Sequence, residues 1–139
     1  MNKNGFTLVE LLAVIAVMGI IIAIAVPATG AVKDKLNEYM LGKKIKLIEK
    51  SAILYGEDYE LDDSTKKYNG NSCIIIQVKD LVPEYLDSET DNGEGFIEDV
   101  TNKGSYLDEK EILIYKEDES VKAIFITDKD KEDNNYICS

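Results

Sequence analysis

The residue types that carry most enzyme chemistry are scarce in this chain. Among its 139 residues there is no histidine, and all sixteen basic residues are lysines. These absences exclude mechanisms that need an imidazole base or a bidentate guanidinium clamp. The sequence also contains no glycine-rich phosphate-binding loop. The composition therefore disfavours an ordinary hydrolase or phosphotransferase. We expect a protein that is not an enzyme, with no catalytic residues and no cofactor.

Three acids near the C-terminus have the spacing of metal ligands. Asp128, Asp130 and Glu132 match the first ligand positions of a calcium-binding loop. The match then fails, because Asp133 stands where the loop needs glycine and Ser139 where it needs a bidentate glutamate. A run of solvated charges is the better interpretation, and we expect no metal site here.

The chain has two cysteines, Cys73 and Cys138, so one intrachain disulfide is available. Outside the cytoplasm the pair should oxidise and close a loop of about 66 residues, which stabilises a fold by roughly 4 kcal/mol in the chain-entropy model. The alternative is a pair of buried free thiols.

Charge is distributed unevenly along the sequence. Residues 1–50 hold seven lysines and four acids, whereas residues 51–139 hold nine lysines and 23 acids, within a net charge of −11. A surface this acidic repels phosphate, so no specific nucleic-acid site is expected.

Residues 6–26 form an apolar block in which Glu10 is the only charged residue. As a helix these residues span roughly 30 Å, enough to cross a bilayer. The alternative is a cleaved secretory signal peptide, since Lys3 precedes the block and residues 23–25 read AIA, a small-x-small cleavage pattern. The block is longer than a usual signal-peptide core and contains a carboxylate, so a membrane helix is favoured.

Glu10 needs a cation or a polar environment. A carboxylate in hydrocarbon costs several kcal/mol unless it is protonated, close to the interface or paired. No lysine lies between Lys3 and Lys33, so the block itself contains no partner. The cation must come from elsewhere.

Residues 5–12 read GFTLVELL and follow a short leader that contains Lys3. This run resembles the class III signal of type IV pilins and the related pseudopilins. The resemblance implies that a membrane prepilin peptidase cleaves between Gly5 and Phe6, and that Phe6 is then N-methylated. It also implies that the Glu10 carboxylate pairs with the N-terminal ammonium of a neighbouring subunit. Such a pair would discriminate between registers in a low dielectric even if its net stabilisation is modest.

Gly19 and Pro27 match positions at which the helix of this family bends or loosens during assembly. Each also has a simpler interpretation, because glycine permits close helix packing in a membrane and proline kinks a helix locally. In the leader, Asn4 separates Lys3 from Gly5, whereas many family members place the basic residue beside the glycine. This departure concerns the efficiency of cleavage and not its position.

A second helical pattern follows Pro27. Apolar residues recur every three or four positions, and the lysines fall largely off that stripe. The stripe consists of Val32, Leu36, Tyr39, Leu41, Ile45, Ile48, Ala52 and Tyr55. The pattern ends at Gly56, a residue suited to a left-handed C-cap. The whole helix is expected to cover about 50 residues, more than a head of this size can bury.

The remaining sequence predicts a small antiparallel sheet. Residues 73–78 are short, β-branched and bounded by turn formers, which is typical of a buried strand. Residues 111–116 and 121–127 form a hairpin around a charged turn. One face of the sheet is expected to cover the helix stripe with Ile112, Ile114, Ile124 and Ile126.

The connections are expected to be mostly irregular. Residues 57–72 are polar and predict a loop, and residues 79–86 predict a short helical turn. Residues 87–95 predict an exposed acidic loop. Residues 96–100 and 136–138 are weaker strand candidates.

Together these elements predict an α+β, pilin-like fold, in which a long N-terminal α-helix packs against a small antiparallel β-sheet. The expected parts are a leader at residues 1–5, a transmembrane or assembly half of the helix at 6–26, and an amphipathic half at 27–56. An acidic globular head with the sheet follows at residues 57–139.

The resemblance implies a structural subunit of a type IV pilus. Such a subunit is stored in the bacterial cytoplasmic membrane and polymerised, alone or with other pilins, into an extracellular fibre for adhesion, motility or aggregation. Its partners would be the prepilin peptidase, the pilus assembly machinery and membrane lipid before assembly. A pseudopilin of a secretion or DNA-uptake apparatus shares the whole signature and stays open. So does a membrane-tethered extracellular binding domain that does not assemble.

Overall fold

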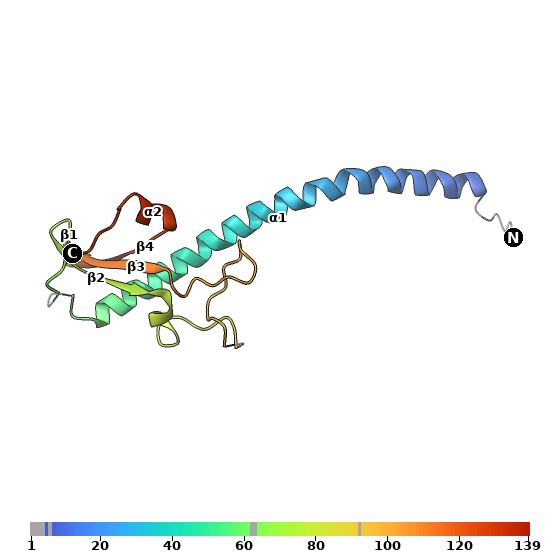
Figure 1. Ribbon diagram of the computed structural model, residues 1–139. Helices are drawn as coiled ribbons and strands as arrows, with labels where there is room; N and C mark the ends of the chain where they lie inside the picture. The colour runs from blue at the N-terminus through green and yellow to red at the C-terminus, as the bar shows by residue number, and fades with distance from the viewer. Residues whose placement is uncertain (1–4, 6, 62–63, 92) are drawn as a thin grey trace. The chain divides into compact units, whose positions relative to one another are not determined.

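The computed structural model describes residues 5, 7–61, 64–91 and 93–139, and the chain divides into two units, Met1–Glu38 and Tyr39–Ser139. Helix α1 (Leu8–Asp58) is continuous through the first unit and into the second, of which it forms the first element (Figure 1). The second unit, which also holds a sheet and a short helix, is called the head unit below.

In the first unit, α1 is exposed along its apolar length. The segment Leu8–Ala25 has a mean hydropathy of 2.9 and no buried residue, so by length and composition it is able to cross a membrane. Its large apolar side chains range from 48% exposed at Val14 to 74% at Leu8. An apolar surface of this extent requires lipid or other helices around it.

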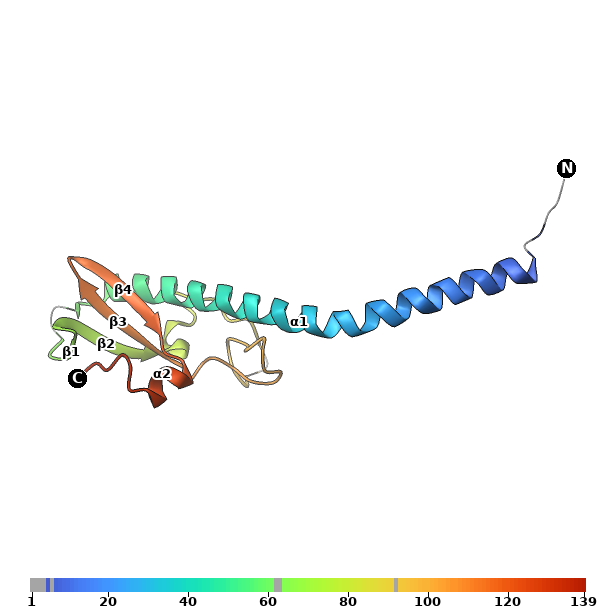
Figure 2. The same ribbon diagram turned by 90° about the horizontal axis from the view of Figure 1, so that it is seen from above.

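The head unit contains a four-stranded antiparallel sheet in the order β1-β2-β3-β4 (Figure 2). The strands are β1 (Lys67–Tyr68), β2 (Asn71–Gln77), β3 (Glu111–Glu117) and β4 (Ser120–Phe125). β3 and β4 form the predicted hairpin, and β1 lies in a segment predicted as a loop. The predicted α+β, pilin-like fold class is confirmed.

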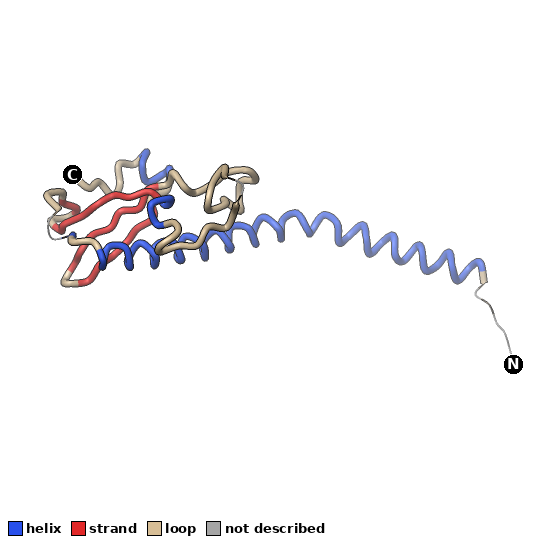
Figure 3. The backbone as a smooth tube through the Cα atoms, turned by 90° about the horizontal axis from the view of Figure 1, so that it is seen from below, coloured by secondary structure: helices blue, strands red, loops and turns tan. Residues whose placement is uncertain are grey.

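One face of the sheet packs on the part of α1 that belongs to the head unit (Figure 3). Ile48 and Ala52 of the helix are fully buried there, as are Ile112 and Ile114 of β3. The same cluster includes Leu41, Ile45, Tyr55, Ile76 and Phe125. Burial of this apolar surface is the main stabilising contribution, and the helix stripe predicted from Leu41 to Tyr55 is correct.

The positions predicted for Ile124 and Ile126 are wrong. β4 pairs Phe125 with Ile112, so Phe125 lies on the face that packs against the helix. Neighbouring residues of a strand point to opposite faces. Ile124 and Ile126 therefore lie on the other face, where they pack with Leu113.

Gly56 is a packing residue and not the end of the helix. α1 continues to Asp58, so the C-cap predicted at Gly56 is wrong. A Cβ added at Gly56 would lie 2.6 Å from Cγ2 of Ile114 and 2.8 Å from Cγ1 of Val121. The missing side chain lets the helix backbone approach the sheet closely.

We expect Gly56→Ala to destabilise the head unit, because the added methyl group overlaps two side chains of a packed core. Overpacking costs about 1–3 kcal/mol, which outweighs the helix propensity of at most about 1 kcal/mol that alanine gains over glycine. Chemical denaturation of the full chain in detergent, followed by circular dichroism, measures the change. Gly42→Ala is the matched control, since a Cβ at Gly42 meets nothing within 4 Å. A Gly56→Ala protein as stable as the Gly42→Ala protein would contradict the packing role.

The C-terminal segment packs on the other face of the sheet. Cys73 of β2 forms a disulfide bond with Cys138, with an S–S distance of 2.07 Å. Next to this bond, Lys67 of β1 and Ser139 exchange two backbone hydrogen bonds, 2.9 and 3.2 Å long. The described residues 136–138 do not form the predicted strand, but the chain end is fixed to the sheet by these bonds.

The chain between β2 and β3 is mostly irregular. It begins with the 3-10 helix η2 (Val78–Leu81), which agrees with the short helical turn predicted for residues 79–86. An isolated bridge between Glu98 and Tyr106 takes the place of the strand predicted for residues 96–100.

A short helix, α2 (Asp128–Glu132), occupies the charge run near the C-terminus. The Asp130 carboxylate accepts a hydrogen bond from the Thr127 N–H at 2.9 Å and caps this helix. Lys110 donates to the Asp128 carboxylate at 2.7 Å, and this hydrogen bond lowers the pKa of Asp128. Asp128 and Asp130 thus have separate partners, and no group of three metal-ligating side chains forms among the residues that the structure describes.

Candidate functional site

The predicted cleavage site lies just before α1. Gly5 is exposed, and a Cβ built on it would meet nothing within 4 Å. Gly5 and Thr7 both precede the helix, which begins at Leu8, whereas Phe6 lies outside the described residues. Of the two residues that flank the predicted cleavage site, Gly5 is therefore exposed in the described structure.

Glu10 and Thr7 cap the start of α1 reciprocally. The Glu10 carboxylate accepts hydrogen bonds from the Thr7 backbone N–H at 3.2 Å and from the Thr7 hydroxyl at 3.5 Å. The Thr7 hydroxyl in turn accepts from the Glu10 backbone N–H at 3.3 Å. This is a capping box, and it places the carboxylate at the positive end of the helix dipole.

The cap determines where the carboxylate of Glu10 lies. The carboxylate is held at the start of α1 by the backbone N–H of Thr7, the second residue after the predicted cleavage site in sequence. Pattern reasoning treated Glu10 only as a charge in an apolar block and missed the cap. The Thr-x-x-Glu spacing of residues 7–10 carried the signal.

Gly19 and Pro27 both lie within α1. Gly19 is exposed, and a Cβ there would meet nothing within 4 Å of its own chain. The glycine therefore leaves a place on the helix surface that another helix can approach closely. The side chain of Pro27 is outside the described part of the chain, and the assembly roles of both residues stay predictions.

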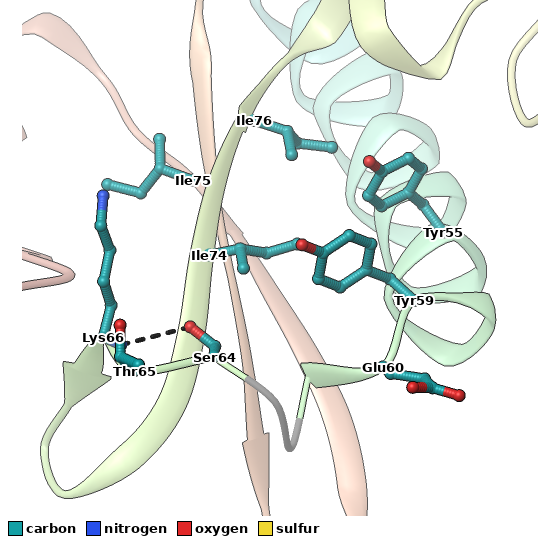
Figure 4. Close-up of a pocket in the computed structure, with 9 residues that line it drawn as sticks. All are labelled: Tyr55, Tyr59, Glu60, Ser64, Thr65, Lys66, Ile74, Ile75 and Ile76. Carbon is teal, nitrogen blue, oxygen red and sulfur yellow. Dashed lines mark hydrogen bonds between the residues drawn. The ribbon is translucent and has the colours of Figure 1, made fainter.

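The pocket drawn in Figure 4 lies between the C-terminal end of α1 and β2, with a volume of about 400 Å³. Tyr55 and Tyr59 line its helix side with nearly parallel rings whose centroids are 6.0 Å apart. Burial raises the pKa of Tyr55, so its phenol stays protonated at neutral pH. Ser64 donates its hydroxyl to the Cys73 carbonyl at 2.7 Å. Neither Tyr55 nor Ser64 is thus arranged as an activated nucleophile.

The N-terminal geometry and the fold define a class of protein. The segment Leu8–Ala25 is an exposed apolar helix whose only charged residue, Glu10, caps its first turn. A glycine precedes the helix, and an α+β head with a disulfide follows it. Together these features make up a pilin-like organisation.

Comparison with known proteins supports the same class. The family described as "Prokaryotic N-terminal methylation motif" matches residues 1–26. Over 77 residues the chain is 30% identical to the type IV wide pilus major component PilA4 of Thermus thermophilus. The matched stretch covers 55% of this chain and 54% of the relative. The chain therefore spans about half the length of the curated relative it matches. No solved structure matches the chain.

The methylation motif and this similarity show that the chain resembles proteins of the type IV pilin family.

Proposed function

We propose that this chain is the structural subunit of a type IV pilus. Its precursor is held in the bacterial cytoplasmic membrane, cleaved between Gly5 and Phe6, N-methylated on Phe6 and polymerised through α1 into an extracellular fibre. The observation that carries the proposal is the N-terminal site. The helix segment Leu8–Ala25 has no buried residue and needs neighbours on all sides, and its single carboxylate, on Glu10, lies at the end that cleavage would expose.

Cleavage would supply the cation that Glu10 lacks. Hydrolysis of the bond between Gly5 and Phe6 leaves an α-ammonium on Phe6, and N-methylation keeps that charge. Each ion alone is costly in apolar surroundings, whereas an ammonium and a carboxylate from neighbouring subunits satisfy each other. The pair would therefore select the subunit register in which the two groups meet.

The name of the similar protein supports a pilus over a pseudopilus, because that protein is a major component of a wide pilus. Assembly would need separate machinery with its own ATPase, since this sequence contains no phosphate-binding loop. Electron microscopy of cells labelled against the head unit separates the alternatives. Long labelled surface fibres are expected, whereas labelled cells without fibres would favour a pseudopilin or a tethered binding domain.

Intact-mass measurement tests the processing step. We expect the mature chain to begin at Phe6 and to carry one methyl group, and Gly5→Val to leave the full-length precursor in the membrane. Because a Cβ at Gly5 meets nothing within 4 Å, loss of cleavage in this variant reports peptidase recognition and not misfolding. The matched control is Gly42→Ala, which should be processed normally. A Cβ at Gly42, within α1, likewise meets nothing within 4 Å. A mature chain that begins at any other residue would refute the proposal.

A further inference from the structure

Within the head unit, α1 has an exposed face that the sheet does not use. Met40, Leu47 and Leu54 lie on it, 46%, 55% and 54% exposed. Their spacing of seven residues places them along one stripe of the helix, about 21 Å long by the helical rise. Single exposed apolar residues are ordinary, but a seam at heptad spacing is typical of a helix surface that packs against something.

Unpaired lysines accompany this seam. Lys43 and Lys50 occur between its apolar residues, and Lys46 lies beside them; all three are exposed. Lys43 lies 5.3 Å from the centre of the Tyr39 ring. None of the three lysines forms an ion pair with any residue that the structure describes. The seam and these lysines are called the basic seam below.

Lys44, unlike these three lysines, forms an ion pair within its own chain. It lies in the same turn of α1, but its side chain packs against the irregular chain between β2 and β3. There its ammonium donates to the Glu89 carboxylate and to the Glu98 carbonyl, both at 2.7 Å. Its side chain is 14% exposed. The segment that it binds is therefore chemically suited to lysines of this helix.

The charge of that segment is the most one-sided in the chain. Residues 80–102 contain eight acids and no lysine. Most of these acids are exposed, among them Asp87, Asp91 and Glu98. Lys44 neutralises one charge at Glu89, which leaves a large excess of negative charge. The described residues of this range, 80–91 and 93–102, are called the acidic segment below.

We propose that the basic seam of one subunit binds the acidic segment of a second copy of this chain. The proposal rests on the proposed function and names a contact within the fibre. Complementary charge identifies the partner, because the same chain carries both unpaired lysines and a lysine-free acidic surface. Two different surfaces that bind each other join subunits head to tail, and such a contact builds an open filament unless the rotation closes a ring.

Carbodiimide cross-linking of fibres tests the contact, since the reagent joins a lysine to a carboxylate only where the two touch. Fibres grown from equal amounts of ¹⁴N- and ¹⁵N-labelled chains distinguish links between chains from links within one. The link from Lys44 to Glu89 should appear within single chains in both detergent-solubilised monomer and fibre, as an internal control. Links from Lys43, Lys46 or Lys50 to the acidic segment should join differently labelled chains and occur only in fibres. Fibres that yield the control link and no such mixed link would overturn the proposal.

Charge reversal gives an independent test. We expect Lys46→Glu with Lys50→Glu, and separately Asp87→Lys with Asp91→Lys, to lower fibre yield by about tenfold or more, because each places like charges opposite one another. The four substitutions together should restore the yield. Lys66→Glu with Lys129→Glu, two exposed lysines outside the seam, changes the net charge as much as the Lys46→Glu, Lys50→Glu variant does and should assemble normally. Wild-type yield in both reversed variants, or no recovery in the combined one, would refute the contact.

These results are separable from failure of the proposed function. If no variant and no wild-type chain forms fibres after cleavage at Gly5, the pilus assignment fails. If wild-type fibres form and Glu10 is required for them, but charge reversal on the seam has no effect, only the seam contact fails. Binding of the purified chain to vesicles rich in anionic lipid that is lost in the Lys46→Glu, Lys50→Glu variant, with fibres unaffected, would assign the lysines to the membrane surface and overturn the proposal.

Discussion

Fibres are expected to disappear when Glu10 is replaced by glutamine, while cleavage and N-methylation continue. Glutamine keeps an oxygen that can accept from the Thr7 N–H, so the cap at the start of α1 can survive. It removes the charge that would pair with the Phe6 ammonium of a neighbouring subunit. Leaving one buried ion without its partner costs about 3–5 kcal/mol, or roughly a hundredfold to several thousandfold in the assembly equilibrium.

Two further variants separate the roles of Glu10. Thr7→Ala removes the hydroxyl that caps the Glu10 N–H at 3.3 Å but keeps the carboxylate, and it should still assemble. Glu10→Ala removes the charge and the carboxylate half of the cap, while the backbone N–H of residue 10 can still donate to Thr7, and it should also fail to assemble. Mass spectrometry of membrane and fibre fractions, with electron microscopy, measures processing and assembly separately. Normal fibres from Glu10→Gln would contradict the pairing and leave capping as the residue's role.

Loss of the disulfide should produce the largest change in the stability of the head unit. Cys73 and Cys138 are 65 positions apart in sequence, and a loop of that length corresponds to about 4 kcal/mol in the chain-entropy model. In the Cys73→Ser, Cys138→Ser variant, the C-terminal segment would be free to leave the face that contains Leu113 and Ile126. Denaturant unfolding of the full chain in detergent measures the effect.

Reduced wild-type protein is the matched control for this variant, because it loses the bond but keeps both sulfur atoms. The two proteins should unfold at similar denaturant concentrations, both well below the oxidised wild type. A decrease of less than about 1 kcal/mol in the free energy of unfolding would show that packing on the outer face, and not the covalent bond, fixes the C-terminal segment.

Local patterns were sufficient to predict the helix and the hairpin. The apolar block, the stripe from Leu41 to Tyr55 and the two β-branched runs each have a period that belongs to one kind of element. These periods led to the α+β fold, and the sequence motif around Gly5 and Glu10 led to the family. The cap formed by Thr7 and Glu10 was also readable from its spacing.

Features that depend on tertiary contacts could not be predicted in this way. Alternation locates a strand but does not say which alternate set faces the helix, so Ile124 and Ile126 were placed on the wrong face. Gly56 has the residue type of a helix end, but its use is set by Ile114 of a strand more than fifty residues later. Similarly, the link from Lys44 to Glu89 depends on how an irregular segment folds back on the helix.

The bond between Cys73 and Cys138 also determines how the head unit would respond to mechanical load. When tension acts between α1 and the C-terminus, force passes directly across the disulfide. The 65 positions that it encloses would otherwise extend to roughly 220 Å at the reach of a stretched chain. With the bond closed, the chain from Tyr59 to Ser72, which includes β1 and the first two residues of β2, is the only part between α1 and the disulfide that can lengthen. The hairpin of β3 and β4 lies inside the loop that the bond closes and is shielded from the load.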